Sequence, residues 1–411
     1  MTRGISDQSR PLASSGLLVR CSPMRRNWVV SAGLVGAAVA IGFVGWSGNP
    51  LTLPLAFAFP ALWALSPSRL VVALVSVGYF LAAARGLPQG VANFYGSNVV
   101  AGIGLWVAAS LAFVGVHAVL WTYRPGWLRV SRYAVAAVLM SVPPFGIVGW
   151  AHPVTAAGIL LPGWGWWGVA AAITGLLAMT TRVWPLVAFM ICWFWAVSVF
   201  TWSEPSAPEG WIGIDTQFRG SEGQYANFVQ QRETIDLVLA AAAHGASVVV
   251  LPESAIGMWT PTVERLWMDA LRDRDIVVNA GAIVVAPGGY DNVMVELTGH
   301  GGRILYRERM PVPVSMWQPW LDWWGEGGGA RAHFFANPVA VSAGATILPV
   351  ICYEQLIVWP VLQSALHAPD VIVATGNGWW TEGTNIVAIQ QASATAWARL
   401  FGLPLVIAFN T

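Results

Sequence analysis

Seven apolar stretches fill the chain between Trp28 and Trp202, near residues 28–46, 51–66, 70–85, 98–121, 132–150, 156–180 and 183–202. Several reach the roughly 20 residues that an α-helix needs to cross the hydrocarbon core of a bilayer. The second and third are shorter, and we expect them to form a tight pair. With 56% hydrophobic and 10% charged residues, the chain is too apolar to be a soluble protein throughout. The pattern predicts a multi-span α-helical membrane domain over residues 28–202.

The arginine residues predict how these stretches cross the membrane. Apart from five in the N-terminal tail, they mark alternate connections, at Arg69, at Arg124, Arg129 and Arg132, and at Arg182. Basic residues collect on the cytoplasmic side, so we expect these connections inside and only Arg85 outside. An odd number of crossings then places the chain after Trp202 outside. The prediction is a multi-pass protein of a bacterial inner membrane, with a cytoplasmic tail (1–27) and a periplasmic C-terminal half.

The sequence changes character at residues 203–210, a polar linker that contains proline. After it, apolar runs of strand type alternate with helical segments. We expect strands at 211–218, 247–251, 276–286, 293–297, 303–307, 339–341, 346–352, 370–374 and 405–408, and helices at 224–244, 261–272, 354–366 and 385–400. Strands mixed with helices of this length predict a layered α/β domain over residues 211–411.

One cysteine in this second half is a candidate nucleophile. Cys352 ends an apolar run of strand type, and Glu253 ends another. A thiol becomes a nucleophile when a base takes its proton and a neighbouring group holds the developing charge. The alternative is that Cys352 is a small buried residue at the end of a core strand, because free cysteines are among the most buried residue types.

Four short motifs follow one another along the chain: Leu-Pro-Glu253, Tyr306-Arg-Glu308-Arg, Cys352-Tyr-Glu354 and Asn377-Gly-Trp379. In this order they resemble the nitrilase superfamily, whose members use a Glu, a Lys and a Cys. The sequence is similar in particular to its membrane-bound branch, the apolipoprotein N-acyltransferases, and to shortened relatives of that branch encoded on conjugative plasmids. The resemblance implies a carbon-nitrogen hydrolase fold, an α-β-β-α sandwich, for residues 211–411, shortened at the C-terminus.

The resemblance also implies roles for individual residues, with Cys352 as the nucleophile and Glu253 as the general base. A carboxylate in a dry pocket has a raised pKa and can accept a thiol proton near neutral pH. For Glu253 alone, the alternative is a carboxylate at a helix N-terminus. The family lysine falls at Glu308, and all 21 basic residues of this chain are arginine. Arg307 and Arg309 are therefore expected to supply charge to an oxyanion, although a guanidinium stays protonated and does not transfer a proton.

Substrate contacts are expected from Tyr353, Glu354, Asn377, Trp379, Trp317, Trp320 and Trp324. The last three, with Leu321, recur at three- and four-residue spacing, which places them on one face of a short helix. That face is either part of the core or an arm hinged at Gly325 and Gly327–Gly329. Such an arm would place its indoles in the membrane interface and gate the entry of an acyl chain.

The sequence leaves two functions open. The first is a membrane-embedded thiol acyltransferase or amidase-like enzyme, which forms a thioester on Cys352 with an acyl group from membrane phospholipid. It would pass that group to an amine or lipoprotein acceptor during plasmid conjugal transfer. The second is a catalytically degraded membrane scaffold that binds proteins of a conjugation apparatus, which the missing lysine favours. No metal or cofactor is expected, and a net charge of +1 gives no reason to expect nucleic-acid binding.

Overall fold

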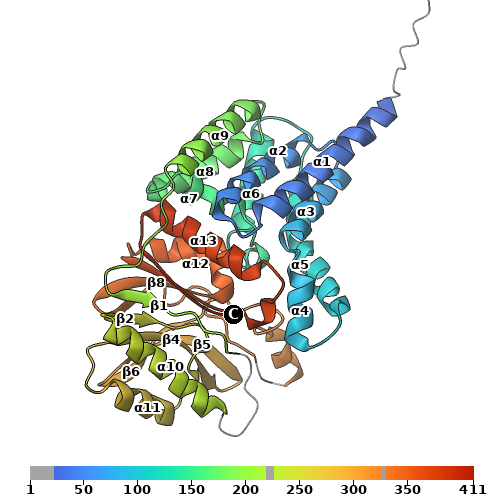
Figure 1. Cartoon of the computed structure of the whole chain (residues 1–411). Coiled ribbons are helices and arrows are strands. Elements are labelled where there is room, and N and C mark those ends of the chain that lie inside the picture. The colour runs from blue at the N-terminus through green and yellow to red at the C-terminus, as the bar shows by residue number, and fades with distance from the viewer. Residues whose placement is uncertain (1–22, 219–225, 326, 328) are drawn as a thin grey trace, which may run out of the picture.

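The computed structural model describes residues 23–218, 226–325, 327 and 329–411, so most of the predicted tail, residues 1–22, lies outside the described range. The first half of the described chain is helical (Figure 1). Its α-helices are α1 (Pro23–Gly45), α2 (Phe59–Leu65), α3 (Arg69–Ala83), α4 (Leu87–Tyr95), α5 (Val99–Leu120), α6 (Trp127–Leu139), α7 (Ala157–Leu160), α8 (Gly165–Ala178) and α9 (Trp184–Phe200). Its 3₁₀ helices are η1 (Pro50–Ala58), η2 (Phe145–Val148) and η3 (Pro153–Ala156).

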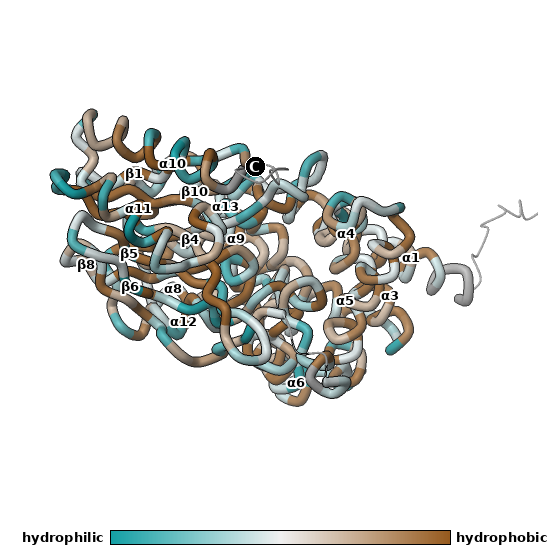
Figure 2. Tube along the Cα trace, turned by 90° about the horizontal axis from the view of Figure 1, so that it is seen from below, coloured by the Kyte–Doolittle hydropathy of each residue, from teal (hydrophilic) through white to brown (hydrophobic). Residues whose placement is uncertain are grey.

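Two of the described helices are long and apolar enough to cross a membrane, namely α1, through Trp28–Gly45, and α5. A third candidate span results if α3 and α4, whose axes differ by 50°, are counted together as one bent span. The remaining apolar helices are shorter than a bilayer core requires. Hydrophobic residues predominate in this region (Figure 2). The predicted apolar stretches contain helices, but 132–150 continues past α6 into a loop and η2, and 156–180 is broken between α7 and α8. The count of seven spans stays a prediction.

The second half contains two β-sheets. The strands are β1 (Trp211–Gly213), β2 (Val248–Val250), β3 (Gly257–Met258), β4 (Val277–Ala286), β5 (Gly289–Thr298), β6 (Gly301–Arg307), β7 (Ala340–Ser342), β8 (Ala345–Ile351), β9 (Val371–Asn377) and β10 (Leu405–Asn410). One sheet has the order β1-β2-β4-β5-β6, with β3 also paired to β4, and the other has the order β10-β9-β8-β7. The pairs β1–β2, β2–β4, β8–β9 and β9–β10 are parallel. Parallel neighbours bring the carboxyl ends of β2, β8 and β9 to sheet edges where a site can form.

Period-two alternation explains how the layers stack. On β8, Ile347 and Ile351 pack between the two sheets, whereas Leu348 and Val350 pack against helices on the opposite face. Those helices are α12 (Val358–Ala365) and α13 (Ile386–Phe401). Helices α10 (Ala226–Ala243) and α11 (Pro261–Leu271) cover the outer face of the larger sheet (Figure 1). The result is the predicted nitrilase-like α-β-β-α sandwich.

Helix α13 joins the sandwich to the apolar helices. One continuous core cluster includes residues of α1, α3 and α7 together with residues of α12, α13, β8 and β9. At Gly158 on α7, a Cβ atom would lie 1.7 Å from the carbonyl oxygen of Ala396 on α13, so only glycine permits this approach. The predicted linker 203–210 joins α9 to β1, but the hydrophobic core does not stop there.

Most predicted elements shift by one to three residues, and three changes matter for the architecture. The strand expected over 211–218 is confined to β1, and the helix expected over 354–366 is divided at Ile357 into η5 (Cys352–Leu356) and α12. The segment expected to join two strands at 287–292 instead belongs largely to β5, which begins at Gly289. The turn is shorter than predicted because Gly288, with φ of +76°, closes a tight hairpin. This last difference moves Asn292 from a loop into a strand.

Candidate active site

Cys352 lies in a strained turn between β8 and η5. Its backbone φ is +46°, a left-handed conformation that a residue with a side chain rarely adopts. The residue is 4% exposed, and its sulfur accepts a hydrogen bond of 3.6 Å from Nε2 of Gln390 on α13. Backbone strain of this kind persists where the surrounding structure holds it, commonly at functional sites. The turn presents the thiol at the carboxyl end of β8, where the sequence predicts a nucleophile.

Glu253 meets the thiol from the other sheet. It follows β2 and is 4% exposed, and it lies close enough to Cys352 for each group to shift the pKa of the other. Asn377, at the end of β9, lines the same cavity, and its backbone N–H lowers the pKa of both groups. No helix begins at Glu253, since the next one, α11, starts at Pro261. The structure therefore brings Glu253, Cys352 and Asn377 together, each from the end of a parallel strand.

A third group, Asn292 on β5, lies against Glu253 and was not identified from the sequence. Its Nδ2 atom donates a hydrogen bond of 2.7 Å to Glu253 and another of 2.8 Å to Glu308. Glu308 is fully buried, and its Oε1 atom has no hydrogen-bond partner within the described chain. The residue at the family lysine position is thus part of the site, but as a carboxyl group held by an amide.

The surroundings of these groups set their protonation at neutral pH. Burial raises the pKa of Glu253 to about 7, against opposing hydrogen bonds from Asn292 and Cys352. Burial also raises the pKa of Glu308 well above its ordinary range, and the charges of Glu253 and Glu354 add to the shift. For Cys352, burial, followed by the charge of Glu253, raises the pKa well above that of a free thiol. The resting site therefore holds a thiol, a neutral Glu308 and a Glu253 that is able to accept a proton.

Glu354, which the sequence suggests as a substrate contact, serves instead as a buried connector. Its Oε1 atom accepts hydrogen bonds from the Tyr306 hydroxyl at 2.6 Å and from the Arg309 backbone at 2.7 Å. Its Oε2 atom accepts one from the Ile351 backbone at 2.8 Å. These bonds tie the end of β6 to the turn that carries Cys352. Glu354 is fully buried and does not line the cavity described below.

The oxyanion role expected of Arg307 and Arg309 finds no support in their placement. The fully buried Arg309 donates to the Tyr306 hydroxyl at 2.9 Å, and its Nε atom lies 3.8 Å from a carboxylate oxygen of Glu354. Arg307 forms an ion pair with Asp291. Neither side chain lines the cavity. The physical reason is the pleat: near the end of β6, residues on either side of Glu308 point away from the face that Glu308 occupies.

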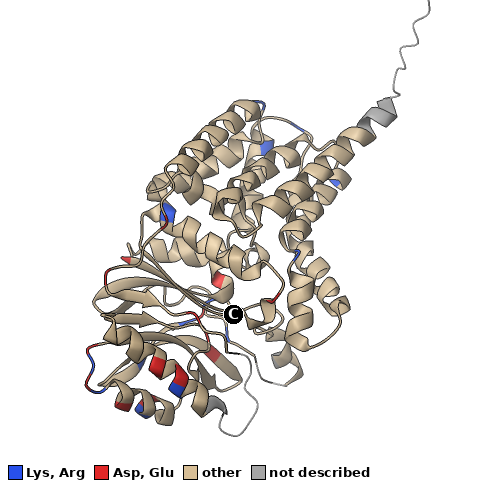
Figure 3. Ribbon diagram, in the orientation of Figure 1, with Lys and Arg blue, Asp and Glu red and all other residues tan. Residues whose placement is uncertain are grey.

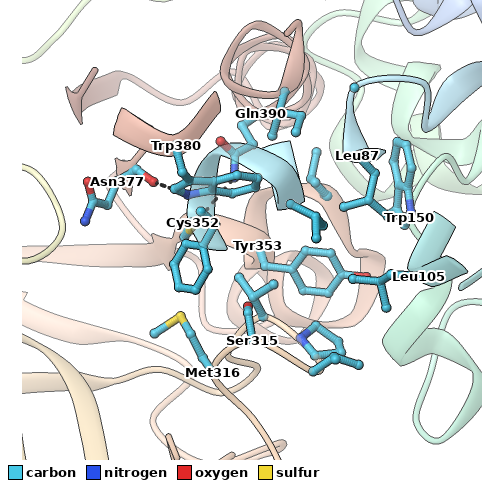
Figure 4. Close-up of a pocket in the computed structure, with 18 of the residues that line it drawn as sticks. Leu87, Leu105, Trp150, Ser315, Met316, Cys352, Tyr353, Asn377, Trp380 and Gln390 are labelled. Carbon is cyan, nitrogen blue, oxygen red and sulfur yellow. Dashed lines mark hydrogen bonds between the residues drawn. The ribbon is translucent and has the colours of Figure 1, made fainter. Parts of the chain in front are cut away.

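A cavity of about 500 Å³ opens from Cys352 toward the apolar helices (Figure 4). At one end its wall includes Glu253, Cys352, Asn377 and Gln390. At the other end the wall is apolar and comes from α3, α4 and α5, with Ala84, Leu87, Val91, Leu105 and Ala108 among its residues. Tyr353, predicted to contact substrate, lies between the two ends, and its hydroxyl donates to the backbone oxygen of Ile147 at 2.7 Å. Among the described residues that line this cavity, none is a lysine or arginine.

Helix α4, which no sequence pattern indicated, closes one side of the cavity. Its Phe94 ring stacks on Trp379 with centroids 5.9 Å apart, and Asn93 donates to the backbone oxygen of Trp380 at 3.0 Å. Trp380 fits so closely that a Cβ atom on Gly90 would lie 2.6 Å from its ring. Trp379, predicted to bind substrate, lines the cavity and contributes to this contact between the two halves.

The tryptophans of the predicted arm lie outside the cavity lining. Trp320 and Trp324 fall in a 3₁₀ helix, η4 (Pro319–Trp324), and Trp324 is 76% exposed. Trp317 packs edge-on against Phe334 with ring centroids 5.7 Å apart. The nearby Met316 does line the cavity. A gating role for this arm stays a prediction.

The family model of the carbon-nitrogen hydrolases matches residues 81–209 and 262–399. The chain belongs to the carbon-nitrogen hydrolase family, that is, to the nitrilase superfamily. It is 56% identical over 422 residues to conjugal transfer protein TraB of Agrobacterium fabrum, covering 100% of both chains. It is also 56% identical over 388 residues to the probable conjugal transfer protein TraB of Sinorhizobium fredii, covering 94% of this chain and 100% of that one.

Solved structures similar to this one include an amidase of the nitrilase superfamily from Nesterenkonia AN1, with a TM-score of 0.37 and 17% identity over 50% of this chain and 78% of that one. A carbon-nitrogen hydrolase from Helicobacter pylori has the same TM-score of 0.37 and 17% identity, over 48% of this chain and 72% of that one.

Proposed function

We propose that this protein is a membrane-embedded thiol acyltransferase or amidase-like enzyme that takes an acyl group from phospholipid onto Cys352. The observation that carries the proposal is the cavity, which has the thiol and its base at one end and an apolar wall from α3, α4 and α5 at the other. An apolar cavity of this volume with a few polar groups at one end suits a ligand with a reactive head and a hydrocarbon tail.

The reaction has two halves. The Cys352 sulfur attacks the ester carbonyl carbon as Glu253 takes the thiol proton. The carbon–oxygen bond to the glycerol then breaks, Glu253 returns the proton to the leaving alkoxide, and a thioester remains. In the second half an amine nitrogen attacks the thioester carbonyl and the carbon–sulfur bond breaks. The amine proton passes through Glu253 to the sulfur, which yields an amide and the free thiol. General-base catalysis of this kind contributes about 10²–10⁴-fold.

The backbone N–H of Asn377, which lowers the pKa of Cys352, is our proposed donor to a developing oxyanion. Helix α13 supplies Gln390 as a second amide donor at the sulfur. In this proposal the neutral donors Asn377 and Gln390 take the oxyanion role that the sequence predicted for Arg307 and Arg309.

The membrane placement also belongs to this proposal. The cavity lies at the C-terminal end of α3 and the N-terminal half of α5, whereas Arg69 begins α3 and Arg124 follows α5. If α5 spans the bilayer, the arginines and the cavity lie at opposite ends of it. Arginines on the cytoplasmic side would then place the site at the periplasmic face of the inner membrane.

The relatives named for conjugal transfer suggest the process in which the enzyme acts. Its acceptor would be an amine, such as that of a lipoprotein, and proteins of the conjugation apparatus are candidate partners. The second candidate function is a catalytically degraded scaffold of that apparatus. The absence of lysine and arginine from the described cavity lining favours it, because no cation is present there to lower the pKa of the thiol.

Intact-protein mass spectrometry after purification from membranes distinguishes the two functions. The parent chain should carry an acyl adduct that Cys352→Ala loses. The exposed Cys192 is the matched control, since Cys192→Ala should keep the adduct. An unmodified parent protein that also fails to react with an acyl-phosphonate probe would overturn the acyltransferase and leave the scaffold.

A further inference from the structure

A second cavity, also of about 500 Å³, lies among the N-terminal end of α3, the C-terminal end of α5 and the start of α6. We call it the arginine pocket, and it is lined by Arg69, Trp121, Thr122, Tyr123, Arg124, Leu128 and Arg132. Three guanidinium groups from three different elements therefore surround one hollow. It is separate from the active-site cavity, with which it shares no residue.

Within the described residues, the three arginines have no acidic partner. Between Asp7 and Glu204 the sequence contains no aspartate or glutamate, and Figure 3 shows the apolar helices with basic residues but without acidic ones. Within the described chain, the Arg69 and Arg124 side chains make no hydrogen bond or ion pair, and Arg132 donates only to the Trp121 carbonyl, at 3.4 Å. Three like charges gathered without a counter-charge repel one another.

The remaining polar groups of the pocket are donors as well. The Trp121 indole nitrogen is buried, its residue only 6% exposed, and it has no hydrogen-bond partner within the described chain. A buried N–H that lacks an acceptor is unfavourable, so a ligand that supplies one is stabilised there. The Thr122 hydroxyl accepts from the Arg124 backbone at 3.2 Å, so its own hydrogen is available. The lining side chains thus present guanidinium, indole and hydroxyl donors, a set that is complementary to a phosphate group.

We propose that the arginine pocket binds the phosphate headgroup of an anionic phospholipid, in the leaflet opposite the active site. The neighbouring Tyr123 and Leu128 are 70% and 40% exposed, which suits contact with the interface and the first acyl carbons. Basic pockets between membrane helices on the cytoplasmic side are a known form of lipid recognition. The proposal rests on the proposed membrane placement but not on the acyl-transfer chemistry.

A basic residue in a predicted cytoplasmic loop is not sufficient to form such a pocket. Arg182 lies in such a loop and is exposed without an acidic partner, but it does not line the arginine pocket. It is therefore the matched control, because it has the same charge and the same predicted side of the membrane.

Native mass spectrometry of the full chain released from detergent measures the binding. Phosphatidylglycerol and phosphatidylcholine serve as probes, with inorganic phosphate as a separate competitor. The parent should retain one phosphatidylglycerol in preference to phosphatidylcholine. The double variant Arg124→Gln/Arg132→Gln should lower the affinity for phosphatidylglycerol by about 30-fold. Each basic residue near the membrane surface contributes roughly a factor of five, and the two factors multiply. Trp121→Phe, which keeps the ring and removes the N–H, should lower it several-fold, and Arg182→Gln should leave it within twofold.

Equal retention of phosphatidylglycerol and phosphatidylcholine by the parent would overturn the proposal. The proposal would also be wrong if Arg182→Gln lowered the affinity for phosphatidylglycerol as much as the double variant does. Displacement of phosphatidylglycerol by millimolar inorganic phosphate would assign the pocket to the free ion and overturn the lipid assignment. Labelling of Cys352 in the same samples reports the active site independently, so an inactive thiol and an empty arginine pocket are distinguishable results.

Discussion

Glu253 and Glu308 accept hydrogen bonds from the same nitrogen atom, Nδ2 of Asn292. A single donor therefore holds two carboxyl groups from different strands in one buried site. Two like charges this close cannot both persist at low cost, so one of the groups keeps its proton. Glu308 is that group, because burial and the neighbouring carboxylates raise its pKa well above its ordinary range. A neutral acid thus occupies the position where the family has a lysine.

The first prediction concerns proton transfer from the thiol. Alkylation of Cys352, followed by peptide mass spectrometry, should become faster as pH rises through about 7, because Glu253 accepts the proton only when ionised and its pKa is raised to about 7. Glu253→Gln should slow labelling by about 100-fold or more and remove this inflection. Equal rates in the variant and the parent across neutral pH would show that Glu253 is not the base.

The second prediction concerns the charge at Glu308. Glu308→Lys should increase the labelling rate of Cys352 at neutral pH, because a cation beside the thiol lowers its pKa. Glu308→Gln is the matched neutral variant and should stay close to the parent, since Glu308 is already uncharged. A Glu308→Lys protein that folds as judged by its unfolding temperature but labels no faster would contradict this account.

The third prediction uses Glu308 as a reporter of stability. Its folded-state pKa is raised, so the folded chain keeps a proton that the unfolded chain loses above pH 4.5. The stability that this proton contributes is fully present below pH 4.5 and is lost as pH rises toward the folded-state value. Glu308→Gln has no such proton to lose. Its unfolding temperature, followed by tryptophan fluorescence, should fall less between pH about 5 and 8 than that of the parent.

The fourth prediction separates the two arginines. Arg309→Gln should destabilise the fold by about 3 kcal/mol, because it leaves the buried Glu354 without its cation. Arg307→Gln should have a smaller effect, since Asp291 keeps its contacts with Arg331 at 2.6 Å and with His333 at 2.9 Å. Chemical unfolding in detergent gives both values. Loss of Cys352 labelling in Arg307→Gln without loss of stability would restore the oxyanion role to that residue.

The fifth prediction tests the contact between the halves. Gly158→Ala should destabilise the whole chain by about 1–3 kcal/mol, because its methyl group overlaps the Ala396 carbonyl on α13. Gly115→Ala on α5 is the control, with no atom within 4 Å of the added methyl, and should be neutral or slightly stabilising. A single unfolding transition that shifts only for Gly158→Ala is expected. Two transitions, with the sandwich unaffected, would show that the halves unfold separately.

The sequence predicted the site residues that lie at the ends of strands, but it did not predict the one that lies inside a strand. Cys352 and Glu253 follow apolar strands, and parallel pairing brings the ends of such strands together. The order of the motifs along the chain was therefore sufficient to predict that the two residues share a site. Asn292 was missed because Pro287-Gly-Gly-Tyr-Asp-Asn has the composition of a loop, whereas a tight turn at Gly288 leaves Asn292 inside β5. Its one signal was a polar residue directly before an apolar strand.

The placement of Arg307 and Arg309 outside the cavity lining was missed for a different reason. Neighbours in sequence were taken as neighbours in space, although adjacent residues near a strand end point to opposite faces. Helix α4 could not be predicted as a separate element, because Pro88 and the bend after α3 interrupt an otherwise continuous apolar pattern. Its role as a wall of the cavity depends on tertiary contacts with Trp379 and Trp380, nearly 300 residues later.

The position of α13 in the chain has a consequence for biosynthesis. This helix completes the core of the apolar half, but it is translated about 185 residues after α9. At roughly 5–20 residues per second, about 10–40 s pass between synthesis of the first half and that of its last packing partner. During that interval the surface of α7 around Gly158 has no α13 against it. That surface stays uncovered until synthesis reaches the end of α13 at Phe401.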